Sequence, residues 1–171
     1  MKKNCSFSFR GFTLIELLVA ISIIGILFTI GMAQYRNFNR RQILLQASQD
    51  LKNNLRSAQS RALAGEKTAS WCDDTGEYLR GYRLRFSSAS NYLIESVCSD
   101  DTVLTIKDFN LPSNVTGENG KTVLFKALGQ GVDDEENDLP GLEDPDVSFV
   151  ITSGSDTKTI TVTKLGEINE S

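Results

Sequence analysis

The sequence predicts an α+β fold in which one long N-terminal α-helix packs against an antiparallel β-sheet or a small β-sandwich. Proline first occurs at position 112, and apolar residues recur three or four positions apart as far as residue 64, as in a continuous helix. After Gly65 the apolar spacing changes to every second residue, with turn-forming residues between the segments. A helix followed by a series of strands is typical of the α+β class.

The first half of the expected helix is an apolar run from Phe12 to about Met32, and its one charged residue is Glu16. A run of about 20 apolar residues can cross a bilayer as a helix, whereas a carboxylate at the centre of such a span costs roughly 2.5 to 3.5 kcal/mol. Glu16 lies near the start of the run, where this cost is lower. If the chain were cut after Gly11, the new amine of Phe12 would be a cation able to pair with such a carboxylate.

The second half of the expected helix is amphipathic from Phe38 onward. Apolar residues spaced three or four apart form one face on which a sheet can pack: Leu44, Ala47, Leu51, Leu55, Ala58 and Ala62. Gly65 is suited to a left-handed C-cap. We therefore expect one helix from about Phe12 to Ala64.

Six short strands are expected in the remaining sequence. Alternating apolar residues place them at Gly81–Phe86, Asn91–Cys98, Thr102–Phe109, Thr122–Ala127, Val147–Thr152 and Thr157–Val162. The first two should form a hairpin. The last two flank a strong turn signal at residues 153–156 and should form another.

The N-terminus closely resembles the prepilin signature of type IV pilins and type II secretion pseudopilins. A leader with Lys2, Lys3 and Arg10 ends at Gly11, and Phe12-Thr13-Leu14-Ile15-Glu16 opens the apolar helix. The resemblance implies that a prepilin peptidase cuts between Gly11 and Phe12 and N-methylates Phe12, and that Glu16 neutralises the Phe12 amine of a neighbouring subunit during assembly. An ordinary secretory signal peptide is the alternative, but its apolar core is shorter than this run.

The resemblance also implies a division of the chain and a location. The leader is residues 1–11, the transmembrane and assembly half of the helix 12–33, the amphipathic half 34–65, and the globular β-domain 66–171. The protein would be a single-pass protein of the bacterial inner membrane, with a periplasmic or extracellular β-domain, before it enters a pilus or pseudopilus. Its expected partners are prepilin peptidase, membrane lipid, and other pilins or pseudopilins contacted through the N-terminal helix.

Looser motifs in the globular half are similar to those of H-type minor pseudopilins and FimT-like minor pilins. These motifs are the helix residues Leu51, Leu55, Ala58, Arg61 and Ala62, then Leu124-Phe125 before Gly129, and Ile160-Thr161-Val162 leading to Gly166. The resemblance implies a helix on a β-sandwich that ends with a strand, a glycine turn and a short closing strand. It predicts a minor pilin or pseudopilin subunit of a type II secretion system or type IV pilus. A DNA- or ligand-binding pilin at a filament tip is the alternative.

Composition and charge do not favour nucleic acid as a partner. DNA-binding FimT-like pilins carry arginines after the final glycine, whereas Glu167 follows Gly166 here. The chain has 18 basic and 22 acidic residues, and a surface of this sign repels phosphates. Arg80, Arg83 and Arg85 make a weak basic footprint, with the last two expected on one solvent-facing side of a strand.

An enzyme is not expected. Histidine is absent, which removes the commonest general base and zinc ligand. No phosphate-binding loop, nucleophile elbow or CxxC motif occurs in the sequence. We therefore expect neither a catalytic residue nor a cofactor.

Calcium is the one metal alternative, because acidic residues are dense between positions 133 and 146. Hard oxygen ligands of this kind hold calcium, and the candidate ligands are Asp133, Asp134, Asp138 and Asp146. A solvated acidic loop explains the same residues, and their spacing does not match an EF-hand.

Cysteine usage agrees with export. Cys5 would leave with the leader, and Cys72 and Cys98 would remain. A disulfide between them would stabilise the domain by about 3 kcal/mol in the chain-entropy model and would persist in an oxidising compartment. Two separate buried thiols are the alternative.

Overall fold

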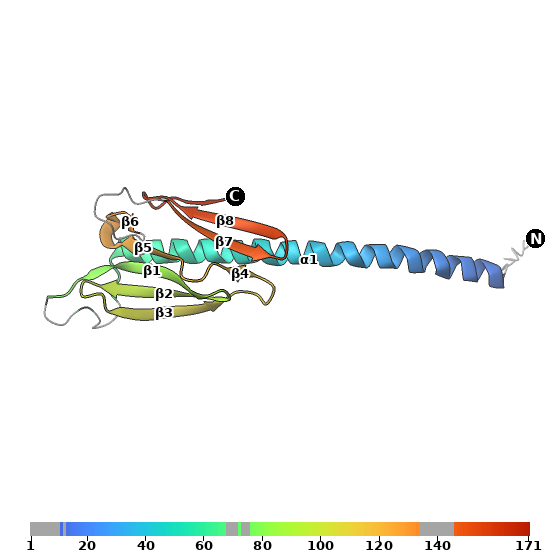
Figure 1. The fold of residues 1–171 in the computed structure, drawn as a ribbon, viewed down its shortest axis with the longest axis horizontal. Helices are drawn as coiled ribbons and strands as arrows, with labels where there is room; N and C mark the ends of the chain where they lie inside the picture. The colour runs from blue at the N-terminus through green and yellow to red at the C-terminus, as the bar shows by residue number, and fades with distance from the viewer. Residues whose placement is uncertain (1–10, 12, 68–71, 73–75, 134–145) are drawn as a thin grey trace, which may run out of the picture. The chain divides into compact units, whose positions relative to one another are not determined.

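The computed structural model describes residues 11, 13–67, 72, 76–133 and 146–171 (Figure 1). The chain divides into two compact units, Met1–Asn39 and Arg40–Ser171. The first unit contains the apolar part of the long helix. The second contains the rest of that helix and all the described strands.

The helix α1 runs from Leu14 to Ala64, and its end lies where the sequence predicts it. Gly65 has a φ of 59°, in the left-handed region that favours glycine. The Gly65 N–H donates to the carbonyl of Ala62 at 3.0 Å, and the Glu66 N–H donates to that of Arg61 at 3.1 Å. These two bonds make a Schellman motif, which satisfies carbonyls that a helix end otherwise leaves without partners.

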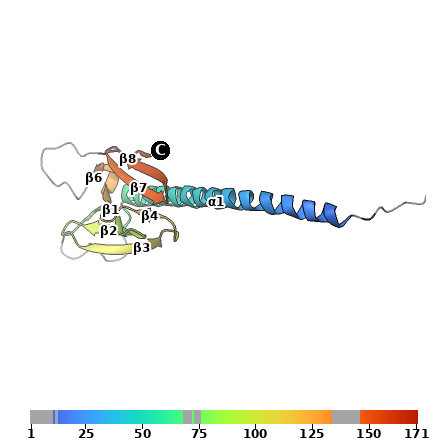
Figure 2. The same cartoon turned by 45° about the vertical axis from the view of Figure 1, so that its right-hand side comes forward.

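The described residues form two antiparallel sheets. The five-stranded sheet has the order β3-β2-β1-β5-β6, and the four-stranded sheet the order β4-β7-β8-β9. The strands are β1 Leu79–Ser88, β2 Asn91–Cys98, β3 Val103–Asn110, β4 Thr116–Gly117, β5 Thr122–Lys126, β6 Val132–Asp133, β7 Val147–Ser153, β8 Asp156–Val162 and β9 Ile168–Glu170. In the second unit, β1–β3 and β7–β8 lie on different sides of α1 (Figure 1), and Figure 2 shows the same arrangement in a turned view.

The core of the second unit lies between the two sheets and the amphipathic part of α1. Every residue of the predicted helical stripe is buried, with exposed fractions between 0 and 3%. From the sheets, Tyr82, Leu84 and Phe86 of β1 alternate into this core, as the sequence predicts. The rings of Phe86 and Phe149, 5.9 Å apart between centroids, connect the two sheets.

The predicted α+β class is confirmed, and so are the two predicted hairpins, β1–β2 and β7–β8. Three strands were not predicted from residue patterns: β4 and β6 have two residues each and β9 has three. Strands of this length are too short to show an alternation. The resemblance to minor pilins did imply the closing strand β9 after Gly166.

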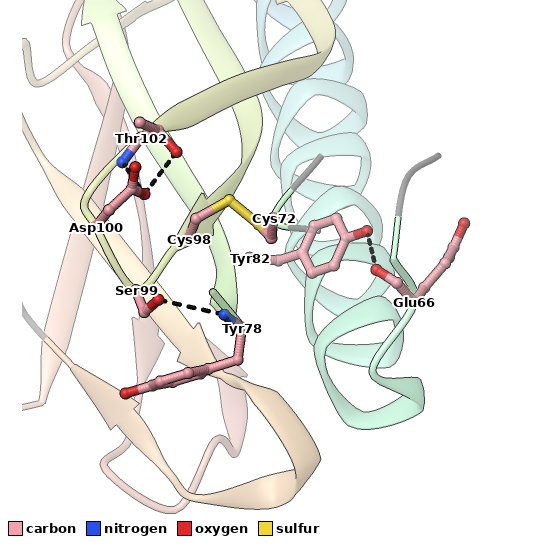
Figure 3. The surroundings of a disulfide bond; sticks show 8 residues. All are labelled: Glu66, Cys72, Tyr78, Tyr82, Cys98, Ser99, Asp100 and Thr102. Atoms are coloured by element: carbon pink, nitrogen blue, oxygen red, sulfur yellow. Dashed lines mark hydrogen bonds between the residues drawn. A yellow bond between two sulfur atoms is a disulfide. The ribbon is translucent and has the colours of Figure 1, made fainter. Parts of the chain in front are cut away.

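The disulfide joins Cys72 to Cys98, with 5.6 Å between their Cα atoms (Figure 3). Cys98 is the last residue of β2, and both cysteines are buried in the core. Nearby, the hydroxyl of Tyr82 donates to the carbonyl of Glu66 at 2.8 Å, just beyond the helix end. The disulfide and this hydrogen bond both attach the segment that follows α1 to the five-stranded sheet.

Replacing Cys72 and Cys98 together by alanine should lower the free energy of unfolding by about 3 kcal/mol, because the open loop gains entropy in the unfolded chain. Urea unfolding of the full-length protein in detergent, followed by tryptophan fluorescence, measures the change. In the uncleaved chain, Cys5→Ala is the matched control and should leave the unfolding midpoint unchanged. An unchanged midpoint in the double variant would show that the disulfide does not stabilise the fold.

Candidate assembly segment and polar sites of the sheet

The start of α1 combines a helix cap with the lone acid of the apolar run. Thr13 precedes the helix, and its Oγ1 accepts a hydrogen bond from the Glu16 N–H at 3.4 Å. Thr-x-x-Glu is the sequence of a capping box, and an acid in the first turn is also stabilised by the helix dipole. The backbone N–H of Glu16 is therefore capped by Thr13 within its own chain, which the sequence prediction missed. Phe12 lies outside the described residues.

The described large apolar side chains that follow in the first unit are exposed. Their exposed fractions range from 50 to 81%: Leu14, Ile15, Leu17, Leu18, Val19, Ile21, Ile23, Ile24, Ile26, Leu27, Phe28, Met32, Tyr35 and Phe38. The most apolar window of α1 has a mean hydropathy of 2.5 and is long enough to cross a membrane. Nothing in the described part of the chain covers this surface, so it is available to lipid or to other helices.

The polar groups of the apolar run are satisfied within the helix. The Ser22 hydroxyl donates to the carbonyl of Leu18 at 2.9 Å, and the Thr29 hydroxyl donates to that of Ile26 at 2.8 Å. Hydroxyls bonded in this way carry no unpaired donor into an apolar medium. Glu16 is thus the one charged group that the run from Phe12 to Met32 would take into lipid or into a bundle of helices.

Comparison with known proteins shows which family motif and which proteins the N-terminal segment is similar to. Residues 6–32 match the family model of the prokaryotic N-terminal methylation motif. The N-terminus carries a type IV pilin signal. Two fimbrial proteins of Pseudomonas aeruginosa are each 36% identical to the chain over 61 residues, which is 36% of this chain and 40% of the relative.

The matches support a type IV pilin and leave its subtype open. The chain spans less than half the length of the curated fimbrial proteins that it matches. No solved structure matches the chain. The pilin-type signal includes Gly11, Phe12 and Glu16, and the cleavage, methylation and register roles of these residues remain predictions.

The five-stranded sheet carries a polar site on the face opposite Tyr82 and Leu84. Glu95 of β2 is directly across from Arg83 of β1 and is only 3% exposed. Its Oε2 accepts from Nε of Arg83 at 2.9 Å, and its Oε1 accepts from Nη2 of Arg85 at 3.2 Å. Arg83 and Arg85 share one polar, partly exposed face, as expected, with 15% and 40% of their side chains exposed. Their pairing with the buried Glu95 was not predicted.

The ionised form of Glu95 is stabilised by these arginines. Burial alone raises the pKa of Glu95, but the hydrogen bonds from Arg85 and Arg83, together with their positive charges, outweigh burial and lower the pKa below 4.5. The pair of arginines is therefore occupied within the chain and is less available to phosphates than the sequence suggested.

The candidate calcium ligands lie only partly within the described residues. Asp133 ends β6, and its Oδ2 lies 3.3 Å from Nζ of Lys126 and 3.8 Å from Nη2 of Arg80. Asp146 Oδ1 accepts from the Lys164 N–H at 3.3 Å. Asp134 and Asp138 lie outside the described residues, and among those described no group of three acidic, cysteine or histidine residues forms a metal site. The calcium alternative stays a prediction, although two cations already neutralise Asp133.

We expect Glu95→Gln to destabilise the protein by about 2 to 3 kcal/mol at pH 7, because hydrogen bonds to charged groups contribute roughly 1.5 to 3 kcal/mol each. A lowered pKa means that the carboxylate stabilises the fold fully above about pH 4.5 and loses this effect as the pH falls through the folded pKa. The difference between wild type and variant should therefore shrink below pH 4.

Urea unfolding of the full-length protein at several pH values measures this dependence. Glu118→Gln, at an exposed acid, is the matched control and should change stability little at any pH. A difference between Glu95→Gln and wild type that stays constant down to pH 3 would contradict the proposed ion pairing.

Proposed function

We propose that the chain is a minor pilin or pseudopilin subunit of a type IV pilus or a type II secretion pseudopilus. A prepilin peptidase removes residues 1–11 and methylates the amine of Phe12. The mature chain is held in the inner membrane by the apolar part of α1 and then leaves it for the filament. Its role is structural rather than catalytic.

The observation that carries this proposal is an exposed apolar helix with one acid in its first turn, joined to the matched methylation motif. In a filament, helices of this kind pack laterally and remove their apolar side chains from lipid. A carboxylate inside such a bundle is unfavourable by roughly 2.5 to 3.5 kcal/mol unless a cation neutralises it. The Phe12 amine of a neighbouring subunit supplies that cation at one axial position, so the pair sets the register.

The contacts of the sheet favour this role over DNA binding at a filament tip. Arg83 and Arg85 are paired with Glu95, and Arg80 Nη1 lies 2.6 Å from Asp101 Oδ1. Arginines held by acids release few counterions on meeting phosphate. A gel-shift assay that shows tight DNA binding by the full-length protein would reverse this preference.

Replacing Gly11 by leucine should leave the leader attached, because a branched side chain at the cleavage junction prevents the peptidase from seating the small residue that it requires. Intact mass spectrometry of the membrane-extracted protein should show residues 1–11 still present and Phe12 unmethylated. Gly25→Leu, within the apolar run, is the control and should be processed normally. Normal cleavage of Gly11→Leu, or cleavage of the native chain at another bond, would contradict the assigned junction.

Glu16→Ala should abolish incorporation into filaments while the second unit stays folded. Glu16→Gln tests the charge of this side chain alone, because glutamine has a similar size, is also found in capping boxes and has no charge. We expect Gln to fail like Ala and Asp to retain part of the incorporation. Immunoblotting of sheared filaments against the membrane fraction measures the outcome, and normal incorporation of Glu16→Gln would exclude charge pairing as the register.

A further inference from the structure

Cations and aromatic residues gather on α1 directly after its apolar run. We call this part of the helix, residues 35–41, the collar. Its cations are Arg36, Arg40 and Arg41. Its aromatic side chains are largely exposed, Tyr35 at 69% and Phe38 at 61%. No acid occurs in the sequence between Glu16 and Asp50, so nothing in this stretch of the helix offsets the charge of the collar.

The length of the apolar run places the start of the collar at the headgroups of a bilayer. From Leu14 to Met32 the helix is about 28 Å long at 1.5 Å per residue, close to the hydrocarbon thickness of roughly 30 Å. Arg36 then lies about 6 Å beyond Met32, and Arg40 about 12 Å beyond it. Because the Cα–Cβ bonds of a helix tilt toward its N-terminus, both side chains start back toward the headgroup layer, which is roughly 5 to 7 Å thick.

Two of the three collar arginines have no acidic partner in the part of the chain that the structure describes. Arg36 forms no ion pair there, and the guanidinium of Arg40 lies beside Gly154, in the turn between β7 and β8. Arg41 Nε lies 3.6 Å from Asp156 Oδ2, and the Arg41 side chain is 70% exposed. Arg36 and Arg40 are four positions apart, on one side of the helix, so they offer two unpaired charges to one anionic surface.

The collar lies on the side of the apolar run where basic residues are usually few. Membrane proteins gather lysine and arginine on the cytoplasmic side. The basic residues on that side here belong to the leader, which the proposed cleavage removes: Lys2, Lys3 and Arg10. The processed helix would then carry side-chain cations only at its exported end. An anionic surface at that end explains why three arginines are tolerated there.

We propose that the collar binds the phosphate groups of anionic phospholipids in the leaflet that faces away from the cytoplasm, mainly through Arg36 and Arg40. The planar guanidinium matches the oxygens of a phosphate, and each basic residue close to an anionic membrane surface strengthens binding. Tyrosine is enriched at this depth, as Tyr35 would be. The inference rests on the proposed function, because it concerns the chain while the membrane holds it.

A lipid surface fits the collar better than an acidic patch on another protein. Successive residues of a helix are about 100° apart, so the exposed side chains of Tyr35, Arg36 and Phe38 point to different sides of α1. Headgroups surround a membrane helix, whereas a protein contact covers one side of it. The apolar run that enters the bilayer also ends within one turn of the collar, so the membrane itself brings phosphates to these residues.

Spin-labelled lipids test the proposal on the membrane-extracted protein. The protein is reconstituted in phosphatidylcholine vesicles that contain a trace of spin-labelled phosphatidylglycerol or, in a parallel sample, spin-labelled phosphatidylcholine. Electron spin resonance gives the fraction of each label that the helix immobilises. We expect phosphatidylglycerol to associate at least about threefold more strongly than phosphatidylcholine at low salt. This preference should decrease as the salt concentration rises, because ions screen the exposed charges.

Replacing Arg36 and Arg40 together by glutamine should remove most of the preference for phosphatidylglycerol. Replacing both by lysine should keep most of it, because the attraction is largely electrostatic. Arg56→Gln with Lys67→Gln is the matched control: it removes two exposed cations of the second unit and should leave the preference unchanged.

Equal association of the two lipids with the wild-type chain would overturn the proposal, and so would a preference that survives in the double glutamine variant. Reduced filament incorporation of that variant, without any lipid preference in the wild type, would assign the arginines to a protein partner instead. Intact mass spectrometry of the same sample shows whether the leader is removed and Phe12 is methylated. An unprocessed N-terminus would refute the pilin assignment, whereas the lipid comparison concerns the collar alone.

Discussion

Burial of one apolar stripe on α1 is the interaction on which the β-domain depends. Both sheets have an apolar face that must be covered, and the stripe from Leu44 to Ala62 contributes to a core that contains residues of both. Three of the six stripe residues are alanines, which allow strands to approach the helix closely. Polar residues outside the stripe then attach the helix to both sheets. The Ser48 hydroxyl donates to Glu170 of β9, the Asn54 amide donates to the Tyr92 hydroxyl of β2, and the Gln59 amide donates to the Gly166 carbonyl in the turn between β8 and β9.

The same helix carries two surfaces suited to different surroundings. Before Arg40 the described apolar side chains are exposed, and after Arg40 the stripe from Leu44 to Ala62 is buried, although Leu45 and Leu63 beside it are exposed. Neither proline nor a break in hydrogen bonding separates the two parts, since α1 is one element from Leu14 to Ala64. The change from an all-round apolar surface to a single stripe is therefore a change of side chains alone, and it is readable in the sequence.

The sequence predicted features that depend on local pattern and missed those that depend on register. Helical spacing predicted the buried stripe and the end of α1 at Gly65, and alternation predicted six strands. The Cys72–Cys98 pair followed from having two cysteines once the leader is removed. Glu95 was not predicted as a site residue, because Arg83 and Arg85 meet it only through the register of the β1–β2 hairpin. The positive φ of Leu128 could not be predicted, because no residue pattern in the sequence indicates a leucine in the left-handed backbone region.

The two carboxylates Glu95 and Glu16 differ in the cations that their surroundings offer them. Glu95 is buried, and the fold brings it two arginines, so its charge is neutralised within the domain. Glu16 receives a hydrogen-bonded cap at its backbone, but no lysine or arginine occurs between Phe12 and Tyr35. Residues three or four positions away on a helix are the ones that can reach it, and no side chain at those positions is basic. Cleavage after Gly11 would create an amine on Phe12, four positions before Glu16. The cation proposed for Glu16 is therefore a chain end, of its own helix or of a neighbouring one, rather than a side chain of the apolar run.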